Sequence, residues 1–465
     1  MAGTGHPAEA PRFEPNWESL KQYNVPDWFR DAKLGIFLHW GVQSVAANDG
    51  WYARHMYVQE GAPWGRAYEH HLKHYNFDNY ASTWQPWNSV NMGPHKDVVG
   101  EWKRAAEGQG LRFGVSSHCD RTWDWFLPSH ASDVRGPLKG VPYDGNLARA
   151  DGTGTWWEGY DPEDLYCRPH RENEPHDPAY LEKWYRRTRE LIDEYQPDLL
   201  YFDGPLPLGE YGLRIAAHFY NANMEWHSGR LEAVINVKSW GAGTVPDESV
   251  IVLDIEKGQS GSLRTFPWQT DTSLLESWFY SPDPLVLSDA VVVHNLCDIV
   301  SKNGNLLLNV GLRSDGTLPE DQEQTLRSVG EWLALNGEAI YGTRPWEVYG
   351  EGPTPVEDGD FRENKTPFTA QDIRFTTKGN TLYAIILGWP ENNRISIRAL
   401  ARGRKLWFGS IEKVTLIGAD AELTWTLSDS GLAVELPGVR KPCDHAYVLR
   451  ITGANSKSLA GASTG

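Results

Sequence analysis

Residues 198–204 read DLLYFDG, a short apolar run that ends in an aspartate and a glycine. Six other segments have a similar form, the last of them less regular: LGIFLHWG (34–41), LRFGVSSH (111–118), EAVINVKSW (232–240), SVIVLDIE (249–256), NLLLNVG (305–311) and RTFPWQTDT (264–272). Predicted helices separate many of them, among them 97–110, 180–196 and 321–337. Nearly continuous apolar strands that alternate with helices are typical of a parallel sheet covered on both faces. We therefore predict an α/β fold with a (β/α)8-like barrel over residues 15–345, whose active site lies at the carboxyl ends of the strands.

The pattern changes after Trp346. Polar and apolar residues then alternate in short runs between Gly, Asn and Asp turns: DIRFTTKGNTLYAIILGW, RISIRAL, KVTLIG, ELTWTLSDSGLAVELPG and HAYVLRITG. Such alternation predicts an antiparallel β-sandwich over residues 346–453. The small, polar residues 454–465 are expected to form a disordered tail.

Composition excludes several classes of partner. The chain has 465 residues and a formal net charge of -18, with no basic block. Nucleic acids and anionic membranes attract Lys and Arg, so we expect neither as a partner. No run approaches the roughly 18 apolar residues of a membrane helix, and the first residues lack the order of a signal peptide. We therefore expect a cytoplasmic protein, with its four scattered cysteines as free thiols.

The predicted strand ends carry polar side chains that a barrel would gather at one edge. They are His39, His118, Asp203, Lys238, Glu256 and Asn309, with Trp40 beside the first. Asp203 and Glu256 lie on different strand ends, and glycoside hydrolysis requires two such carboxyl groups. None of these residues forms a phosphate cradle or has metal-ligand spacing, so we expect no metal. The 22 tryptophans and 20 tyrosines also favour a carbohydrate ligand, although aromatic residues build protein cores as well.

Longer motifs resemble one family. WFRDAKLGIFLHWGVQSV (28–45) and WYARHMY (51–57) resemble the opening strand and loop of the family 29 α-L-fucosidases. SKNGNLLLNVGLRSDGTLPEDQ (301–322) and GEWLALNGEAIYGTRPW (330–346) resemble the closing strand and helix of that family. The resemblance implies a barrel followed by a β-sandwich, and a retaining mechanism. It also implies that Asp203 is the nucleophile and Glu256 the acid/base, with Asp254 and Glu276 as competitors for the second role.

The resemblance implies a substrate-binding shell around these carboxylates. Its expected members are His39, His118, Trp51, Trp123, Tyr201 and Trp278, although each histidine or aromatic ring could instead be structural. One family feature is missing: a strand that ends in His-His-Asp should precede the strand at 111–118. Instead, HLKHY at 71–75 runs directly into NFDNYAS. Gly50 and Lys238 are two smaller departures, and His70, His71 and His74 are expected to be solvated.

The predicted activity is release of terminal α-L-fucose by double displacement. The partner is then a fucosylated oligosaccharide or glycoconjugate, and no cofactor is needed because both steps use carboxyl groups. Two alternatives stay open: a catalytically weakened or inactive fucose-binding protein of the same fold, and a hydrolase of another deoxy or galacto-configured sugar. The sequence predicts neither the linkage preference nor the oligomeric state.

Overall fold

The computed structural model describes residues 12–40, 44, 47, 54, 56–58, 82–240, 247–363, 366–404, 410–436, 438 and 440–454. The chain divides into two compact units. Unit 1 comprises Met1–Pro26 and Gly41–Val252, and unit 2 comprises Asp27–Trp40 and Leu253–Gly465.

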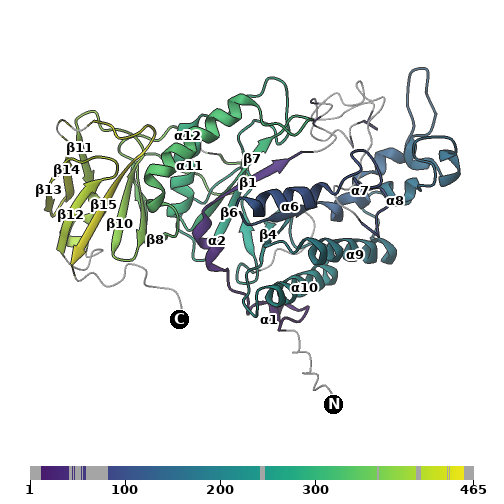
Figure 1. The fold of residues 1–465 in the computed structure, drawn as a ribbon, viewed down its shortest axis with the longest axis horizontal. Coiled ribbons are helices and arrows are strands. Elements are labelled where there is room, and N and C mark those ends of the chain that lie inside the picture. The colour runs from purple at the N-terminus through teal and green to yellow at the C-terminus, as the bar shows by residue number, and fades with distance from the viewer. Residues whose placement is uncertain are drawn as a thin grey trace, which may run out of the picture. The chain divides into compact units, whose positions relative to one another are not determined.

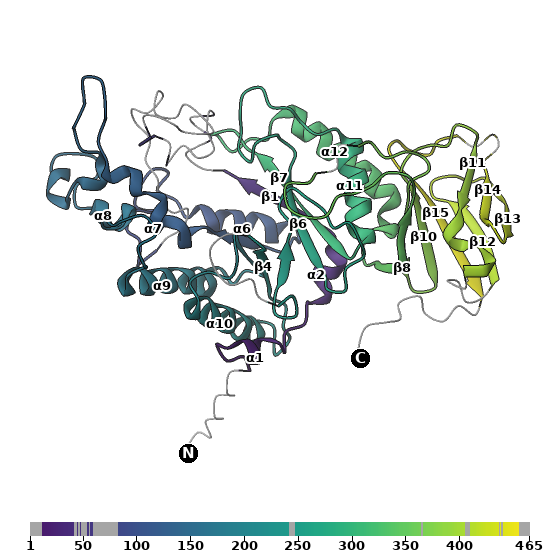
Figure 2. The ribbon, with the colours of Figure 1, turned by 180° about the vertical axis from the view of Figure 1, so that it is seen from behind.

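Unit 1 contains three parallel strands in the order β4-β3-β2. They are β2 (Gly114–Ser117), β3 (Leu199–Phe202) and β4 (Val234–Lys238). The longer helices of this unit are α6 (Val98–Gly108), α9 (Pro178–Tyr195) and α10 (Glu210–Trp226). Helices α9 and α10 lie side by side in both ribbon views (Figures 1 and 2).

Helix α9 precedes β3 in the chain, and capping residues define both of its ends. Asp177 caps its start by accepting a hydrogen bond from the Tyr180 amide, and Pro178 supplies a first residue that has no N–H to satisfy. Gln196 ends the helix in the left-handed conformation, with φ of 42°. Strand β3 then follows with Leu200, Tyr201 and Phe202 at most 2% exposed, as expected for a strand covered on both faces.

Short helices fill much of the remainder of unit 1. They are α1 (Trp17–Leu20), α7 (Thr122–Trp125) and α8 (Pro162–Tyr166), with 3-10 turns at Cys119–Arg121, Leu127–His130, Asp144–Asn146 and Arg149–Gly152. Most of them lie in the long connection between β2 and α9. Phe126 and Tyr166 of this connection form a separate small core with Trp87, which precedes α6 in the chain.

Unit 2 contains four parallel strands in the order β1-β7-β6-β5. They are β1 (Leu34–His39), β5 (Val252–Asp254), β6 (Trp268–Ser273) and β7 (Gly304–Gly311), accompanied by α2 (Asp27–Ala32), α11 (Asp289–Ser301) and α12 (Glu320–Asn336). Strands β1 and β7 run parallel, with Leu34 opposite Leu306 and His39 opposite Gly311. Helices α11 and α12 pack against each other, with α11 also against β7 (Figure 1).

The antiparallel strands of unit 2 form two sheets. The strands are β8 (Arg344–Glu351), β9 (Ile373–Lys378), β10 (Thr381–Ile386), β11 (Arg394–Ile397), β12 (Ser410–Leu416), β13 (Thr424–Ser428), β14 (Gly431–Glu435) and β15 (Tyr447–Ala454). One sheet has the order β12-β15-β10-β9-β8 and the other β11-β14-β13. Trp346, Phe375 and Leu432 belong to the core that the two sheets share.

A buried ion cluster joins α11 to the five-stranded sheet. Asp298 of α11 accepts hydrogen bonds from Lys302 (2.7 Å) and from Arg374 of β9 (2.5 Å). All three side chains are at most 4% exposed. The division into units therefore keeps the later barrel strands with the sandwich and does not fall at Trp346. The boundaries 15–345 and 346–453 stay a prediction.

The predicted fold class is confirmed, because the seven predicted barrel strands pair in parallel and the strands after Trp346 pair antiparallel. Strand β8 was not predicted. It contains Pro345, lies at the edge of its sheet and has a register shift between Pro345 and Gly350, and proline is tolerated at such positions. The described residues do not include the segment around HLKHY (71–75), where the expected His-His-Asp strand is missing from the sequence. They also do not include His70, His71, His74 or the tail from residue 455.

Candidate active site

Asp203 follows directly after β3, and two cationic side chains and a histidine surround its carboxylate. Lys238 at the end of β4 places Nζ 3.2 Å from Oδ1, and Arg121 places Nη1 3.0 Å from Oδ2. The Nδ1 atom of His118 lies 3.5 Å from the same Oδ2. Both carboxylate oxygens therefore face positive charge at the end of a buried strand.

These cations decide the protonation state of Asp203. Burial raises the pKa of its carboxyl group, but His118, Lys238 and Arg121 outweigh burial and hold the pKa below its usual value. The neighbouring Asp120 behaves in the opposite way. Burial raises the pKa of Asp120 to about 6, although Arg121 opposes the rise. Asp203 is thus an ionised, partly shielded carboxylate at neutral pH, as a nucleophile must be.

Gly204 makes room for one of the cations. A Cβ at this position would lie 3.3 Å from Nη2 of Arg121, closer than most side-chain contacts allow. Arg121 also lies over the ring of Trp240, with its guanidinium carbon 5.4 Å from the ring centroid. Gly204 does not have a positive φ, so a left-handed backbone conformation does not require a glycine at this position. Its small size leaves space for the guanidinium group of Arg121.

Lys238 is buried to an unusual degree for a lysine, with 1% of its side chain exposed. Besides Asp203, its ammonium group lies 5.8 Å from the ring centroid of Tyr201 and 5.4 Å from that of Trp240. Such contacts with aromatic faces offset part of the cost of burying the charge. Tyr201, predicted as a wall of the sugar pocket, is 2% exposed and packs beneath this cation.

In unit 2, Glu256 lies two residues beyond the end of β5 and is 6% exposed. Its backbone is held on both sides by residues from the connection between β8 and β9. The Glu256 amide donates to Oδ1 of Asp360 (2.7 Å), and its carbonyl accepts from the amide of Phe361 (2.7 Å). Lys257, the next residue, has a left-handed φ of 42°. These contacts position Glu256 through its main chain.

The two competitors of Glu256 occupy different surroundings. Asp254 lies within β5, is fully buried and accepts a 2.5 Å hydrogen bond from Gln269. Glu276 is exposed, and its carbonyl accepts a hydrogen bond from Lys257 (2.8 Å). Strand β5 ends at Asp254, but the amides of Ile255 and Lys257 still donate to the carbonyls of Gln269 and Asp271 in the neighbouring strand.

His39 ends β1 and is oriented by Asn309 of β7. The Nδ2 group of Asn309 donates to Oγ of Ser273 and to the carbonyl of Trp278, both at 2.8 Å. Its Oδ1 is then the atom that faces Nδ1 of His39, at 2.7 Å. Because this oxygen only accepts hydrogen bonds, Nδ1 of His39 carries the proton.

Aromatic residues flank this histidine. The rings of Trp278 and Phe279 lie 5.4 and 5.3 Å from the His39 ring, and Nζ of Lys257 lies 5.0 Å from the Trp278 ring. Half-buried Trp278 thus remains a candidate wall of the sugar pocket. Unit 2 therefore contributes His39, Trp278 and Glu256 from three different strand ends.

Trp123 and Trp51 were also predicted to bind the substrate. Trp123 is 1% exposed, stacks on His170 with ring centroids 4.0 Å apart, and donates its indole N–H to the Glu174 carbonyl. Its ring faces are therefore engaged by the protein, and we leave Trp123 out of the proposed sugar contacts. Trp51 lies outside the described residues.

Comparison with known proteins identifies the family. The sequence profile described as "Alpha-L-fucosidase" matches residues 1–77 and 69–338, which is more than half of the chain. The chain belongs to the α-L-fucosidase family. A second profile, "Alpha-L-fucosidase C-terminal domain", matches residues 365–452. The first match is in two pieces that meet at residues 69–77, where the sequence lacks the expected His-His-Asp segment.

Relatives and solved structures agree with this assignment. The chain is 27% identical to the tissue α-L-fucosidase of Mus musculus over 96% of this chain and 95% of that protein. It is also 27% identical to the Homo sapiens tissue enzyme, over 95% and 92%. A Thermotoga maritima α-fucosidase in complex with fucose has a TM-score of 0.65 and 25% identity, and covers 94% of this chain and all of its own. A complex of the Thermotoga maritima enzyme with a mechanism-based inhibitor has a TM-score of 0.67, also at 25% identity.

The chain is accordingly a glycoside hydrolase, and the alternative of an inactive binding protein is not favoured. Within the described part of the chain, no group of three or more His, Cys, Asp or Glu side chains could hold a metal ion. In the same residues, no helix is long and apolar enough to span a membrane. The four cysteines are free thiols.

Sequence reasoning did not identify several residues that contact Asp203 in unit 1 or Glu256 in unit 2 of this α-L-fucosidase. Arg121 lies in a 3-10 turn beyond β2, and Asp360 and Phe361 lie more than a hundred positions from Glu256. Asn309 was recognised only as a strand end, without its partner His39. The one available signal for Arg121 was the glycine after Asp203, because a missing Cβ marks a close approach.

Proposed function

We propose that this α-L-fucosidase releases L-fucose from the non-reducing end of α-linked fucosides with retention of configuration. Asp203 is the nucleophile and Glu256 the acid/base. The observation that carries the proposal is the environment of Asp203, a carboxylate at the end of a buried strand whose pKa is lowered by His118, Lys238 and Arg121. The family assignment supports the same activity.

In the first step, Asp203 attacks the anomeric carbon from the face opposite to the leaving group. Glu256, in its protonated form, gives its proton to the oxygen of the departing aglycone. The product of this step is a covalent β-fucosyl ester of Asp203. Lys238 and Arg121 stabilise the carboxylate before attack, and their charge also favours its departure in the next step.

In the second step, ionised Glu256 removes a proton from water. The water attacks the anomeric carbon of the ester, and Asp203 leaves as a carboxylate. Two inversions restore the α configuration of the released fucose. His39 and Trp278 are proposed to bind the sugar, with the tryptophan offering its indole face.

The test follows the anomeric configuration of the first product by NMR, with an activated aryl α-L-fucoside as substrate. Retention predicts α-fucose first, and β-fucose as the first product would contradict the mechanism. Aryl fucosides and aryl glycosides of other galacto-configured sugars, compared side by side, test the choice of sugar. The retaining mechanism also requires the two carboxyl groups to come to about 5–5.5 Å from each other in the liganded enzyme.

The two roles are separated by rescue with azide. Asp203→Gly should lose turnover by orders of magnitude, and azide should replace the missing nucleophile to give β-fucosyl azide by one inversion. Glu256→Ala should still form the ester from an activated aryl fucoside, and azide should then release it as α-fucosyl azide by two inversions. If Glu256→Ala is impaired equally on activated and unactivated substrates and shows no rescue, another residue is the acid/base, with Asp254 and Glu276 next to test.

A further inference from the structure

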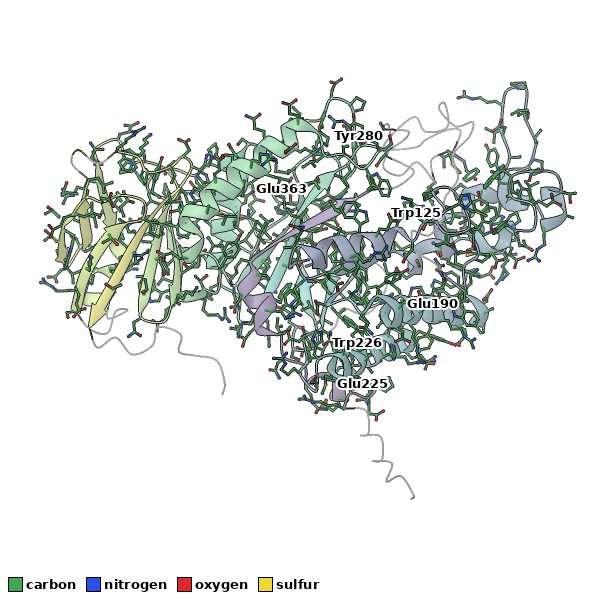
Figure 3. The ribbon with its side chains drawn as sticks, in the orientation of Figure 1. Trp125, Glu190, Glu225, Trp226, Tyr280 and Glu363 are labelled. Atoms are coloured by element: carbon green, nitrogen blue, oxygen red, sulfur yellow. The ribbon has the colours of Figure 1, made fainter. Side chains whose placement is uncertain are left out.

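The connection between β8 and β9 returns to the ends of the parallel strands of unit 2. We name residues 358–363 the return segment. Asp358 accepts from the Gly261 amide (2.8 Å), the Gly359 amide donates to the Gln259 carbonyl (3.1 Å), and Glu363 accepts from Thr272 Oγ1 (2.6 Å). Figure 3 labels Glu363 at the end of this segment. Together with the two bonds to Glu256, these contacts fix the segment along the loop that carries the proposed acid/base.

One side chain of the return segment is unusual. Phe361 is 62% exposed, although phenylalanine is among the residues that proteins most often bury. Its φ of 57° is left-handed, a conformation that is costly for a bulky residue. The Phe361 amide nevertheless donates to the Glu256 carbonyl at 2.7 Å, so the main chain at Phe361 is tied to that of the proposed acid/base residue.

We propose that Phe361 is a specificity-determining residue that stacks on the leaving group of the substrate. This inference rests on the proposed role of Glu256. The acid must touch the glycosidic oxygen, and the first ring of the leaving group is bonded to that oxygen. Phe361 is hydrogen-bonded to the acid residue and carries an exposed aromatic ring. We therefore expect this ring to contact the leaving group and not the fucose.

The chemistry of Phe361 selects the class of leaving group. A phenyl ring has no hydrogen-bonding atom, so it recognises an apolar face: an aryl ring, or the C–H face of a neutral hexopyranose. The neighbouring Arg362 pairs with Glu357 (2.6 Å), so its charge is engaged within the same connection. We expect neutral fucosyl disaccharides and aryl fucosides to use this contact, and substrates without a ring in the leaving group not to use it.

The test compares three substrates: α-L-fucosyl fluoride, whose leaving group is a single atom, an aryl α-L-fucoside, and a fucosyl disaccharide with a neutral hexopyranose. Phe361→Ala should lower kcat/KM on the aryl and disaccharide substrates by about three- to tenfold, as expected for loss of one stacking contact. On the fluoride, kcat/KM should stay within about twofold of wild type. Phe361→Trp should restore kcat/KM on the two substrates whose leaving group contains a ring.

The matched control is Phe266→Ala, the same change at another exposed phenylalanine (40%). Phe266 precedes the first residue of β6, whereas the proposed site lies beyond the last residues of the parallel strands. It should leave all three substrates unaffected. Equal losses on all three substrates for Phe361→Ala would mean that Phe361 only supports Glu256, and unchanged values would mean no contact; either overturns the subsite. Failure of the wild-type enzyme to hydrolyse the fluoride would instead refute the proposed function, and the subsite with it. Thermal melting of each variant establishes that it is folded, and Phe361→Leu, which keeps apolar bulk without a flat ring, replaces Phe361→Ala if that variant unfolds.

Discussion

The balance of burial and charge at Asp203 leads to a specific prediction for Lys238→Met. Methionine has nearly the same length as lysine and suits a buried site, so the change removes a charge with little loss of packing. In the native protein, burial raises the pKa of Asp203 while His118, Lys238 and Arg121 lower it. Lys238 acts through both its charge and its hydrogen bond to the carboxylate. Its removal should therefore shift the balance towards the protonated acid.

The size of the effect follows from the geometry. The Lys238 ammonium lies 3.2 Å from Oδ1 and is 1% exposed, whereas the side chains of Arg121 and His118 are 28% and 48% exposed. Solvent screens exposed charges more than buried ones, so the buried charge of Lys238 should contribute strongly beside His118 and Arg121. An opposite charge at this range typically lowers a carboxyl pKa by about 1–3 units. We expect the pKa of Asp203 to rise by about that amount in the variant.

The assay is the pH profile of kcat/KM on an activated aryl fucoside, because its acidic limb reports the essential carboxylate of the free enzyme. The limb should move to higher pH by about 1–3 units in Lys238→Met. Lys238→Arg keeps the charge and should move it much less. Lys183→Met, at a half-exposed lysine paired with Asp164 on the surface, is the control for losing a positive charge elsewhere.

An unchanged acidic limb in Lys238→Met, with only a uniform loss of rate, would refute this account. It would mean either that Asp203 does not govern the limb or that Arg121 and His118 alone keep it ionised. The same comparison has a stability counterpart. Because the folded-state pKa of Asp203 is lowered, its contribution to folding is present above the unfolded-state pKa and is lost as pH falls through the folded value.

Two further predictions concern stability. Burial, assisted by Arg344 and Arg30, lowers the pKa of Lys33 to about 7, so the unfolded chain binds more protons than the folded one between pH 7 and about 10, and stability should rise with pH there. Urea unfolding at pH 7.5 and 9.5 should show a gain of about 3 kcal/mol that Lys33→Met lacks, and an equal pH slope in both proteins would contradict it. Asp298→Ala should lower the free energy of unfolding by about 3–5 kcal/mol, because it leaves the buried cations Lys302 and Arg374 without their shared carboxylate. Replacing all three residues with apolar residues of similar size should lower the free energy of unfolding far less. A small effect of Asp298→Ala in denaturant unfolding would show that water reaches the cluster.

The parallel strands could be predicted because their signal is local. A strand buried on both faces needs a run of apolar residues whatever its neighbours are, and DLLYFDG meets that need within seven residues. The position of Asp203 could be predicted for the same reason, since a carboxylate directly after such a run lies at the end of a strand. Strand β8 was missed because an edge strand tolerates Pro345 and so lacks the local signal.

The partners of these residues could not be predicted in the same way. Arg121 reaches Asp203 across a turn of the β2 loop, and that approach depends on the packing of two strands and on the missing Cβ of Gly204. His39 and Asn309 are 270 positions apart, and only the parallel pairing of β1 with β7 brings them together. Sequence patterns report which residues end a strand, but the contacts between strand ends depend on the fold.

The return segment shows why the proposed acid/base, Glu256, is harder to assign from sequence than the proposed nucleophile, Asp203. Asp203 is fixed by its own strand, so one local motif suffices to find it. Glu256 lies beyond its strand, and its position depends on Asp360 and Phe361, which hold its amide and carbonyl from 104 and 105 positions away. Because these bonds use only the main chain of Glu256, they place its carboxyl group without drawing on it. The connection between two sandwich strands can therefore vary in the residue beside the acid, here Phe361, and so change the preferred leaving group while the acid itself stays in position.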